Sequence, residues 1–466
     1  MHYCRTKIVC TLGPSSSSRE ALRSLMDAGL NVARINFSHS THEQHAATIA
    51  LVRDVARETR RPIAILGDLQ GPRIRIGELS ESRVLEDGSD MVLVPERFLR
   101  GDEIPVTYEG LADDVHVGDR VLINDGLLEL VVLDVTKPRV TARVLHGGSL
   151  ASHKGINLPG VQVSAPSITD KDREDVAFAV EQGLEYIALS FVRRAQDIAE
   201  LRSMIPKSML VVAKIEKDSA LENIETIVRA SDGVMVARGD LGVELPFEEV
   251  PYAQKRIIAL CNRLGRPVIT ATQMLESMIT HPRPTRAEAS DVANAILDGT
   301  DAVMLSAETA AGQYPRLAVE AMSRIIAEIE GKPLQFGHED RRREMAMSTE
   351  FAIAAASSAA VSMLNAPVLI VFTKSGFSAR VVASHRPSVP ILVLTDVPQT
   401  FRQLALVWGV IPELVPHCNT YDEMVRLALE AVQRRDLARA GDRVVVTAGV
   451  PFDVPGTTNL MKVETV

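Results

Sequence analysis

Residues 210–240 read LVVAKIEKDSALENIETIVRASDGVMVARGD, and this stretch decides the fold. It contains two short apolar runs rich in β-branched residues, Leu210–Ile215 and Gly233–Ala237, with a helical pattern between them. Runs of this length predict buried strands, and a helix between two of them predicts that the strands lie parallel. Both runs end in charged residues, which places candidate functional groups at the carboxyl ends of two neighbouring strands.

The same alternation recurs on both sides of this stretch. Eight runs predict strands: Thr6–Leu12, Asn31–Phe37, Pro62–Asp68, Tyr186–Phe191, Leu210–Ile215, Gly233–Ala237, Pro267–Thr272 and Ala302–Leu305. Helical patterns lie between them, at Ser18–Ala28, His42–Arg60, Asp170–Gln182, Ile198–Met204 and Phe247–Leu264. Eight strand and helix units predict a TIM (β/α)8 barrel.

The spacing of these units breaks once, after the third strand. Residues 72–164 show alternating strand patterns, turn signals such as Asn124-Asp125-Gly126 and little helical periodicity. This predicts a small β-barrel domain inserted into a barrel formed by residues 1–71 and 165–338. Because Gly71-Pro72 and Ala165-Pro166 flank it, we expect a lid that swings over the barrel mouth.

The C-terminal part of the chain predicts a separate α/β domain. After the charged run Glu339–Glu344, a helical pattern precedes strand signals at Val368–Phe372, Ile391–Leu394 and Arg443–Thr447. Residues 345–466 are therefore expected to have their own core. The apolar stretch Phe351–Phe372 is rich in Ala and Ser and is interrupted by Asn365 and Pro367, so it predicts a core helix and a strand, not a membrane span.

The composition excludes several classes of protein. A chain of 466 residues with 46% hydrophobic and 24% charged residues is typical of a globular protein of about three domains. The 51 Lys and Arg against 60 Asp and Glu give a net charge of −9, which argues against nucleic acid as a partner. The N-terminal residues lack a signal-peptide pattern, and four cysteines without metal-type spacing indicate reduced thiols in a cytoplasmic protein.

Polar residues follow six of the eight predicted strands. In a TIM barrel the active site lies at the carboxyl ends of the strands, so these residues are expected to converge. Any strand must end in a polar loop, but six polar ends that converge on one face are difficult to explain in this way alone. The six ends are Arg34–Ser38, Gly67–Gln70, Lys214–Glu216, Arg238–Asp240, Thr270–Gln273 and Ser306–Glu308.

Two of these ends predict a metal site. Glu216 and Asp240 end neighbouring strands, and two carboxylates facing one cavity suit Mg²⁺ or Mn²⁺ shared with a substrate. Lys214 lies on the same strand face as Glu216, so a structural salt bridge between them is the alternative. Arg34 could bind phosphate, and with Lys214 and the Thr272 hydroxyl the set is typical of phosphoryl transfer.

Longer motifs resemble the pyruvate kinase family along the whole chain. They are Thr6–Val9 with Thr11–Pro14, Ala33–His39, Lys214–Glu216, Ala237–Gly242, Ala271–Met278, Pro284–Glu288 and Met304–Thr309. The resemblance implies a barrel, an inserted lid and a C-terminal regulatory domain. It also implies phosphoryl transfer from phosphoenolpyruvate to ADP, giving pyruvate and ATP, in a homotetramer.

The resemblance also assigns roles to individual residues. Glu216 and Asp240 would hold the metal, Lys214 and Arg34 would brace the phosphoryl group, and a second divalent ion would arrive with the nucleotide. Thr272 would lie near the enolate, with a place in the proton relay. Substrate contacts are implied for Ala237, Arg238, Gly239, Asp240, Thr272 and Ser306, and nucleotide contacts for Arg34, Asn36, His39 and Arg75.

Two other functions remain open on the residues alone. A metal-dependent carbon-carbon lyase could use the same carboxylates to bind an enolate, with Lys214 as base or Schiff-base amine. Such an enzyme needs neither ADP nor a closing lid. A metabolite sensor without activity would keep the third domain, but the active-site groups are all present.

The C-terminal domain contains a candidate effector site at Thr373, Lys374, Ser375, Gly376 and Ser378. This segment follows a strand and opens a helix, where free amides and hydroxyls favour an anion, although a plain helix cap is the alternative. By resemblance the effector is a sugar phosphate or nucleoside monophosphate, with 450–459 as a covering loop. Because Phe377 stands where many relatives carry a basic residue, glucose 6-phosphate or AMP is favoured over a bisphosphate.

The chain departs from the potassium-dependent relatives at one place. Asn36, Ser38 and Asp68 match their potassium site, but Leu69-Gln70 replaces Thr-Lys and Arg73 replaces Glu. A fixed guanidinium near the site would repel K⁺ by about 4 kcal/mol at roughly 4 Å and an effective dielectric near 20. We therefore expect that K⁺ is not required and that Arg73 belongs to the active site, the alternative being a solvated hinge arginine.

Overall fold

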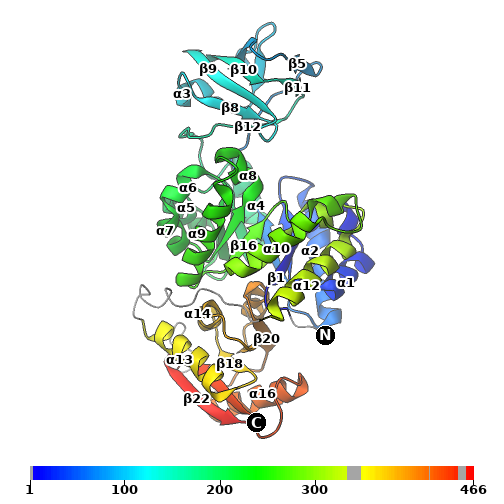
Figure 1. Cartoon of the computed structure of the whole chain (residues 1–466), viewed down its shortest axis with the longest axis vertical. Helices are drawn as coiled ribbons and strands as arrows, with labels where there is room; N and C mark the ends of the chain where they lie inside the picture. The colour runs from blue at the N-terminus through cyan, green and yellow to red at the C-terminus, as the bar shows by residue number, and fades with distance from the viewer. Residues whose placement is uncertain (1–3, 333–347, 419, 450–457) are drawn as a thin grey trace.

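The computed structural model describes residues 4–332, 348–418, 420–449 and 458–466. Figure 1 shows three bodies stacked along the long axis of the molecule: a β-rich lobe, a central barrel wrapped by helices, and a C-terminal α/β body. The chain enters the β-rich lobe and returns from it in the first half of the sequence. The barrel is therefore covered at one end by the inserted lobe and at the other by the C-terminal body.

The central body is a closed barrel of eight parallel strands, as predicted. Every strand pairs in parallel with its neighbours, in the order β1-β17-β16-β15-β14-β13-β3-β2. The strands are β1 (Lys7–Thr11), β2 (Val32–Asn36), β3 (Ala64–Asp68), β13 (Tyr186–Leu189), β14 (Leu210–Ile215), β15 (Gly233–Ala237), β16 (Val268–Ala271) and β17 (Ala302–Leu305). Their residues are nearly all buried, because helices cover the outside and side chains fill the inside.

Helices surround the barrel and begin at the residues that cap them. Ser18, Thr41, Thr169 and Thr285 each accept a hydrogen bond from an amide in the first turn of the helix that follows. The longer helices are α1 (Arg19–Ala28), α2 (His42–Thr59), α4 (Asp170–Glu181), α5 (Ala195–Met204), α7 (Ile224–Ala230), α9 (Val250–Arg263), α10 (Arg286–Asp298) and α12 (Pro315–Glu330). Short helices follow three strands: α6 (Asp218–Glu222), α8 (Arg238–Glu244) and α11 (Ala307–Ala310).

The inserted lobe is a strongly curved sheet of seven strands in the order β4-β12-β8-β9-β10-β6-β7. Its edges meet, because Ile76, just after β4, bridges Val106 of β7. The strands are β4 (Ile74–Arg75), β6 (Asp90–Pro95), β7 (Ile104–Val106), β8 (Arg120–Ile123), β9 (Leu128–Thr136), β10 (Arg139–His146) and β12 (Gly155–Asn157), with β5 (Arg83–Leu85), β11 (Gly148–Leu150) and α3 (Leu111–Asp114) beside them. The lobe has its own apolar core.

The C-terminal body is a five-stranded sheet in the order β20-β19-β18-β21-β22, in which only β22 runs antiparallel. Helices α13 and α14 pack on one face and α16 on the other. Its elements are α13 (Thr349–Leu364), β18 (Leu369–Phe372), α14 (Phe377–Ser384), β19 (Ile391–Thr395), α15 (Pro398–Gln403), η4 (Leu404–Leu406), β20 (Val410–Leu414), α16 (Tyr421–Arg434), β21 (Arg443–Ala448) and β22 (Leu460–Thr465).

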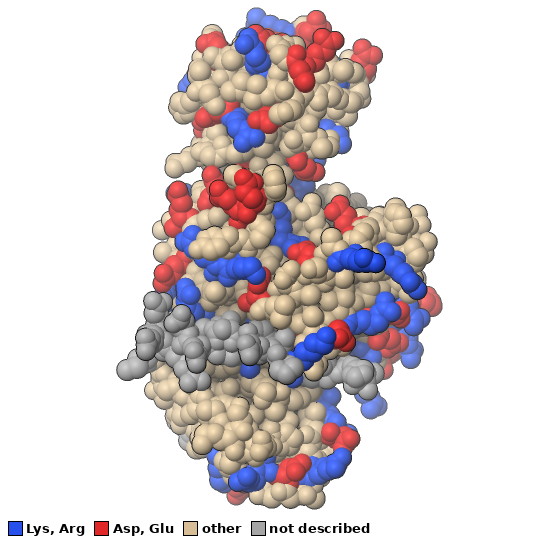
Figure 2. Space-filling view, in the orientation of Figure 1, with Lys and Arg blue, Asp and Glu red and all other residues tan. Residues whose placement is uncertain are grey.

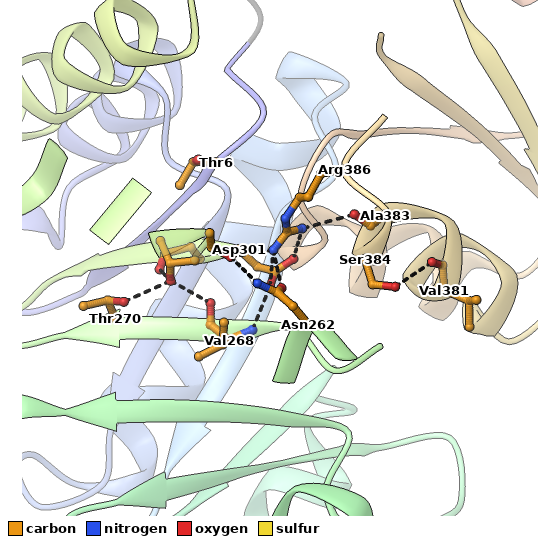
Figure 3. A network of polar contacts seen from close by, with 12 residues as sticks. Thr6, Asn262, Val268, Thr270, Asp301, Val381, Ala383, Ser384 and Arg386 are labelled. Carbon is orange, nitrogen blue, oxygen red and sulfur yellow. Dashed lines mark hydrogen bonds and ion pairs between the residues drawn. The ribbon is translucent and has the colours of Figure 1, made fainter. Parts of the chain in front are cut away.

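The C-terminal body closes the end of the barrel where the strands begin. Ala405 and Leu406 of η4 belong to the same apolar cluster as the side chains inside the barrel. Figure 3 shows Arg386 reaching from the end of α14 to Asp301 and Asn262. The Arg386 side chain is fully buried, with Nη1 2.9 Å from Asp301 Oδ1 and Nη2 2.7 Å from Asn262 Oδ1. A buried charge pair of this kind ties the two bodies together.

Two expectations about the chain as a whole can be compared with the structure. Cys4, Cys10, Cys261 and Cys418 are all free thiols. Among the described residues, no helix combines the length and the apolar character needed to cross a membrane.

Candidate active site

Lys214 lies at the mouth of the barrel between two carboxylates. Its Nζ is 2.8 Å from Glu216 Oε1 and 3.2 Å from Asp68 Oδ1, and only 8% of its side chain is exposed. Burial opposes the charge, but Asp68 and Glu216 outweigh it and raise the pKa of Lys214 above its ordinary value. Lys214 is therefore a fixed cation at neutral pH.

Arg34 is a second cation that binds Asp68. Its Nε donates to Asp68 Oδ2 at 2.6 Å, and its Nη1 donates to Thr11 Oγ1 at 2.8 Å. Burial raises the pKa of Asp68, but Lys214 and Arg34 reverse the effect and hold it below its usual value. Asp68 thus orients both cations, and the guanidinium, which has about five N–H donors, keeps donors for an anion.

Glu216 and Asp240 have the donor chemistry of a divalent metal site. Glu216 is buried, with Oε2 accepting a hydrogen bond from the Phe191 amide at 2.7 Å. Burial and the negative charge of Asp240 raise the pKa of Glu216 above its usual value, although the positive charge of Lys214 lowers it. Two neighbouring carboxylates are stabilised by a hard cation, so these residues fit Mg²⁺ or Mn²⁺. The structural alternative is also realised in part, since Lys214 and Glu216 form an ion pair.

The protein contributes few ligands at this position. Among the described residues, no three His, Cys, Asp or Glu side chains gather where they could hold a metal ion. A cation here would therefore complete its coordination with water and substrate, as two carboxylates from neighbouring strands predict.

Thr272 and Arg238 stabilise the turns around the site. The Thr272 hydroxyl accepts from the Gly239 amide at 2.7 Å and donates to Ala271 O at 2.6 Å. The hydroxyl hydrogen is thus already donated to Ala271 O, so Thr272 can enter the suggested proton relay only if this hydrogen bond breaks. Arg238 pairs with Asp291 on α10 and donates to Thr272 O, so its side chain serves the scaffold.

The other predicted substrate residues lie on the same rim. Ala237 ends β15, and Gly239 and Asp240 lie in α8, which begins directly after that strand. Ser306 follows β17, and its amide donates to the buried Glu308 at 2.7 Å. The Gly239 and Ser306 amides on this rim are thus bound to the side chains of Thr272 and Glu308.

A cleft of about 810 Å³ separates the inserted lobe from the barrel. Its lining includes Arg73 and Arg75 from the lobe side and Phe191, Lys217 and Asp240 from the barrel side. Figure 2 shows the molecule narrowing where the two bodies meet, with acidic side chains gathered on the barrel below the lobe. Both arginines thus face the same space as a predicted metal ligand.

The two cleft arginines differ in their surroundings. Arg73 is exposed, whereas Arg75 is partly buried and donates to His153 O at 2.8 Å. Burial lowers the pKa of Arg75, and the positive charge of Arg73 lowers it further. The exposure of Arg73 fits a hinge arginine as well as a residue that meets a ligand.

Asn36 is the last residue of β2, and Ser38 and His39 follow it. Asn36 Oδ1 accepts from the Ser38 amide at 3.1 Å, which shapes the turn, and His39 is exposed. Asp68, which the sequence groups with Asn36 and Ser38, is instead paired with Arg34 and Lys214.

The sequence did not single out the two strand ends that hold the charged groups in place. Thr11 ends β1 and accepts from Arg34, while Ser190 follows β13 and accepts from Lys214 Nζ at 2.7 Å. Phe191 adopts a left-handed backbone, φ 54°, which is uncommon for a bulky residue and often marks functional sites. The sequence offered little sign of the roles of Thr11 and Ser190, because a single hydroxyl residue at the end of an apolar strand is common.

The candidate effector residues Thr373–Gly376 form the loop between β18 and α14, and Ser378 lies in the first turn of α14. Gly376 caps the helix with φ 76°, and its amide donates to Thr373 Oγ1 at 3.0 Å. Lys374 pairs with Asp396, which also contacts His417. Ser378 Oγ lies 2.6 Å from Thr458 Oγ1, whereas residues 450–457 of the expected covering loop lie outside the described residues.

Comparisons with known proteins agree with this geometry. The family model described as pyruvate kinase, barrel domain, matches residues 3–319, and the one described as pyruvate kinase, alpha/beta domain, matches residues 351–464. The chain is 49% identical to the pyruvate kinase of Geobacillus stearothermophilus, over 99% of this chain and 80% of that protein. It is 47% identical to pyruvate kinase 2 of Synechocystis, over 99% of this chain and 79% of that protein. The chain therefore belongs to the pyruvate kinase family, phosphotransferases that act on phosphoenolpyruvate and ADP to give pyruvate and ATP.

Proposed function

We propose that this chain transfers the phosphoryl group at the barrel mouth, with Lys214 and Arg34 acting on the transferring group. The observation that carries the proposal is the shared carboxylate: Asp68 binds Lys214 on one oxygen and Arg34 on the other. Two cations held side by side can neutralise a phosphoryl group whose charge increases on its outer oxygens during transfer.

A coupled assay for pyruvate tests this function. Pyruvate should form from phosphoenolpyruvate only when both ADP and Mg²⁺ are present. The alternative, a metal-dependent carbon-carbon lyase, would release its product without ADP. The curated relatives support the transferase.

Glu216 and Asp240 are the proposed metal ligands, and members of the family generally depend on Mg²⁺. Bound there, Mg²⁺ or Mn²⁺ would neutralise the negative charge of the substrate and of the developing enolate. Glu216 is held for this role by the Phe191 amide and by Lys214. A second divalent ion would accompany the nucleotide.

The remaining substrate contacts are proposed from the rim residues. Backbone amides from Ala237 to Asp240 would receive the carboxylate of phosphoenolpyruvate, with Ser306 beside them. The Thr272 hydroxyl would face the enolate, and entry into a proton relay would require it to release Ala271 O. In this arrangement the chain binds and orients the substrate without a covalent intermediate.

The nucleotide is proposed to enter through the cleft between the lobe and the barrel. Arg75 lines this cleft. Asn36 at the end of β2 and His39 on the loop after it are assigned to the nucleotide by the resemblance. We propose that residues 72–164 form the lid, residues 1–71 and 165–338 the catalytic domain and residues 345–466 the effector domain. The family resemblance further implies a homotetramer, and a cytoplasmic location agrees with four free thiols.

The chain is also proposed to work without K⁺. Asp68 of the matched potassium site is already neutralised by two cations. Arg73 lines the cleft with Asp240 and adds a permanent positive charge there. A further monovalent cation would meet repulsion from these groups.

We expect full activity in a tetramethylammonium buffer, with little stimulation by added KCl. Arg73→Glu should lower this activity, because it exchanges a cation on the cleft wall for an anion. Combined with Leu69→Thr and Gln70→Lys, it is expected to create a K⁺ requirement. Strong stimulation of the unmodified chain by K⁺, measured as steady-state rate, would contradict the proposal.

The effector is proposed to be a monophosphate held by the loop Thr373–Ser378. The loop offers the hydroxyls of Thr373 and Ser375 before α14, whose amides favour an anion. Ser378 lies in the first turn of α14, where its buried hydroxyl contacts Thr458. Lys374 forms an ion pair with Asp396, which offsets its positive charge, so the net positive charge at the loop is modest. This favours a singly phosphorylated metabolite over a bisphosphate.

Glucose 6-phosphate or AMP is expected to shift the phosphoenolpyruvate concentration at half-saturation by about fivefold or more, the lower range of allosteric coupling. Ser375→Asp should abolish the shift, because a carboxylate repels the phosphate, while Ser362→Asp on the exposed side of α13 should preserve it. A saturation curve that neither compound moves would assign the loop to helix capping alone.

A further inference from the structure

The turn after β13 holds both charged groups of the proposed reaction. Ser190 is 1% exposed, and its Oγ accepts from Lys214 Nζ at 2.7 Å. The next residue, Phe191, donates its amide to Glu216 Oε2 at 2.7 Å. Two consecutive residues thus fix the cation that acts on the phosphoryl group and a proposed metal ligand.

The hydrogen-bond inventory of Ser190 determines what it can do. A serine hydroxyl has one hydrogen, and here Ser190 Oγ donates to Leu69 O at 2.7 Å. The oxygen therefore faces Lys214 with a lone pair and acts only as an acceptor. Its position is set by the backbone of Leu69 and not by a mobile side chain.

Lys214 has three N–H donors, and three acceptors surround them. The carboxylates of Glu216 and Asp68 are charged, and their other oxygens accept from the Phe191 amide and from Arg34. Ser190 is neutral, and Lys214 is its side-chain partner among the described residues. An approaching phosphate is repelled by the carboxylates of Glu216 and Asp68 but not by the neutral Ser190 hydroxyl, so the hydrogen bond from Lys214 to Ser190 is compatible with a bound phosphate. Ser190 is thus the acceptor best suited to retain the direction of the ammonium.

The same turn lies against the entrance to the lid. Gly71 has φ 68°, and a side chain there would come within 2.7 Å of the Phe191 ring and 3.1 Å of Ser190 Cβ. The close approach explains why glycine is needed where the chain leaves β3 for the lobe. Leu69, which accepts from Ser190, belongs to the same exit segment.

We propose that Ser190 is a positioning residue for phosphoryl transfer, which acts by fixing the ammonium of Lys214 against the backbone of Leu69. The proposal rests on the proposed function. A misdirected cation stabilises the transition state less while substrate still binds, so the turnover number is the quantity that should respond.

Ser190→Ala is expected to lower kcat by about 10- to 100-fold, with the KM for phosphoenolpyruvate within about twofold. Ser190→Cys should be intermediate, because a thiol is a weaker acceptor. The matched control is Ser231→Ala, which removes a fully buried hydroxyl whose one hydrogen bond among the described residues is to Ile227 O at 2.6 Å. Ser231→Ala should retain kcat, and thermal unfolding should show similar losses of stability for the two alanine variants.

A double-mutant cycle separates positioning from general packing. In a Lys214→Met background, Ser190→Ala should cause no further loss of kcat, because its partner is already absent. The same loss in both backgrounds, or a Ser190→Ala enzyme as active as the Ser231→Ala enzyme, would overturn the inference. An unmodified chain that forms no pyruvate would instead overturn the proposed function on which it rests.

Discussion

Lys214→Met is expected to lower kcat on the order of 10³-fold or more, the range reported for cations that stabilise a transferring phosphoryl group. Lys214 is a buried cation held by Asp68, Glu216 and Ser190. No other lysine among the described residues contacts these three side chains, so no second ammonium is in place to substitute for Lys214. The measurement is the steady-state rate at saturating substrate, with the Mg²⁺ dependence recorded in parallel.

Lys7→Met is the matched control for this variant. Lys7 is also buried, but it lies at the opposite end of the barrel and donates to Val410 O at 2.8 Å. Its loss should lower the melting temperature and leave kcat within a few-fold. Near-normal turnover of Lys214→Met would contradict the role assigned to this residue.

Asp240→Asn is expected to raise the Mg²⁺ concentration needed for half-maximal activity by at least about tenfold, because even groups behind metal ligands cost that much when removed. Glu216→Gln should act in the same direction and lower kcat as well, since Glu216 also holds Lys214. Both substitutions keep the shape of the side chain and remove only the charge. The measurement is a Mg²⁺ titration of the initial rate.

An exposed carboxylate provides the comparison for these two variants. Glu225 lies on α7 and pairs with Arg229 on the surface. Glu225→Gln should leave the Mg²⁺ titration unchanged, since surface ion pairs contribute little. If Asp240→Asn gave the same titration as Glu225→Gln, Asp240 would not be a metal ligand.

The barrel could be predicted from sequence because its strands are buried on both faces. Such strands appear as continuous apolar runs, and the eight predicted runs coincide with the eight observed strands. Two strands of the C-terminal sheet were missed. Strand β20 contains Pro412 and Glu413, and β22 is largely exposed, so neither presents a run of this kind.

The charged centre was predictable, whereas its supports were not. Lys214 and Glu216 alternate along one strand, so their proximity follows from local geometry. The contacts of Ser190 and Thr11 depend on how neighbouring strands align, which a sequence does not state. Arg386 is a clearer case, because its partners Asn262 and Asp301 are 124 and 85 residues away.

The central claim is that this site moves a phosphoryl group from phosphoenolpyruvate to ADP. Phosphorus NMR of the purified chain with both substrates and Mg²⁺ follows that group directly. We predict that the phosphoenolpyruvate signal falls as the γ-phosphate signal of ATP rises by an equal amount, and that neither changes when ADP is omitted. Release of inorganic phosphate in place of ATP, or loss of phosphoenolpyruvate without ADP, would contradict the account.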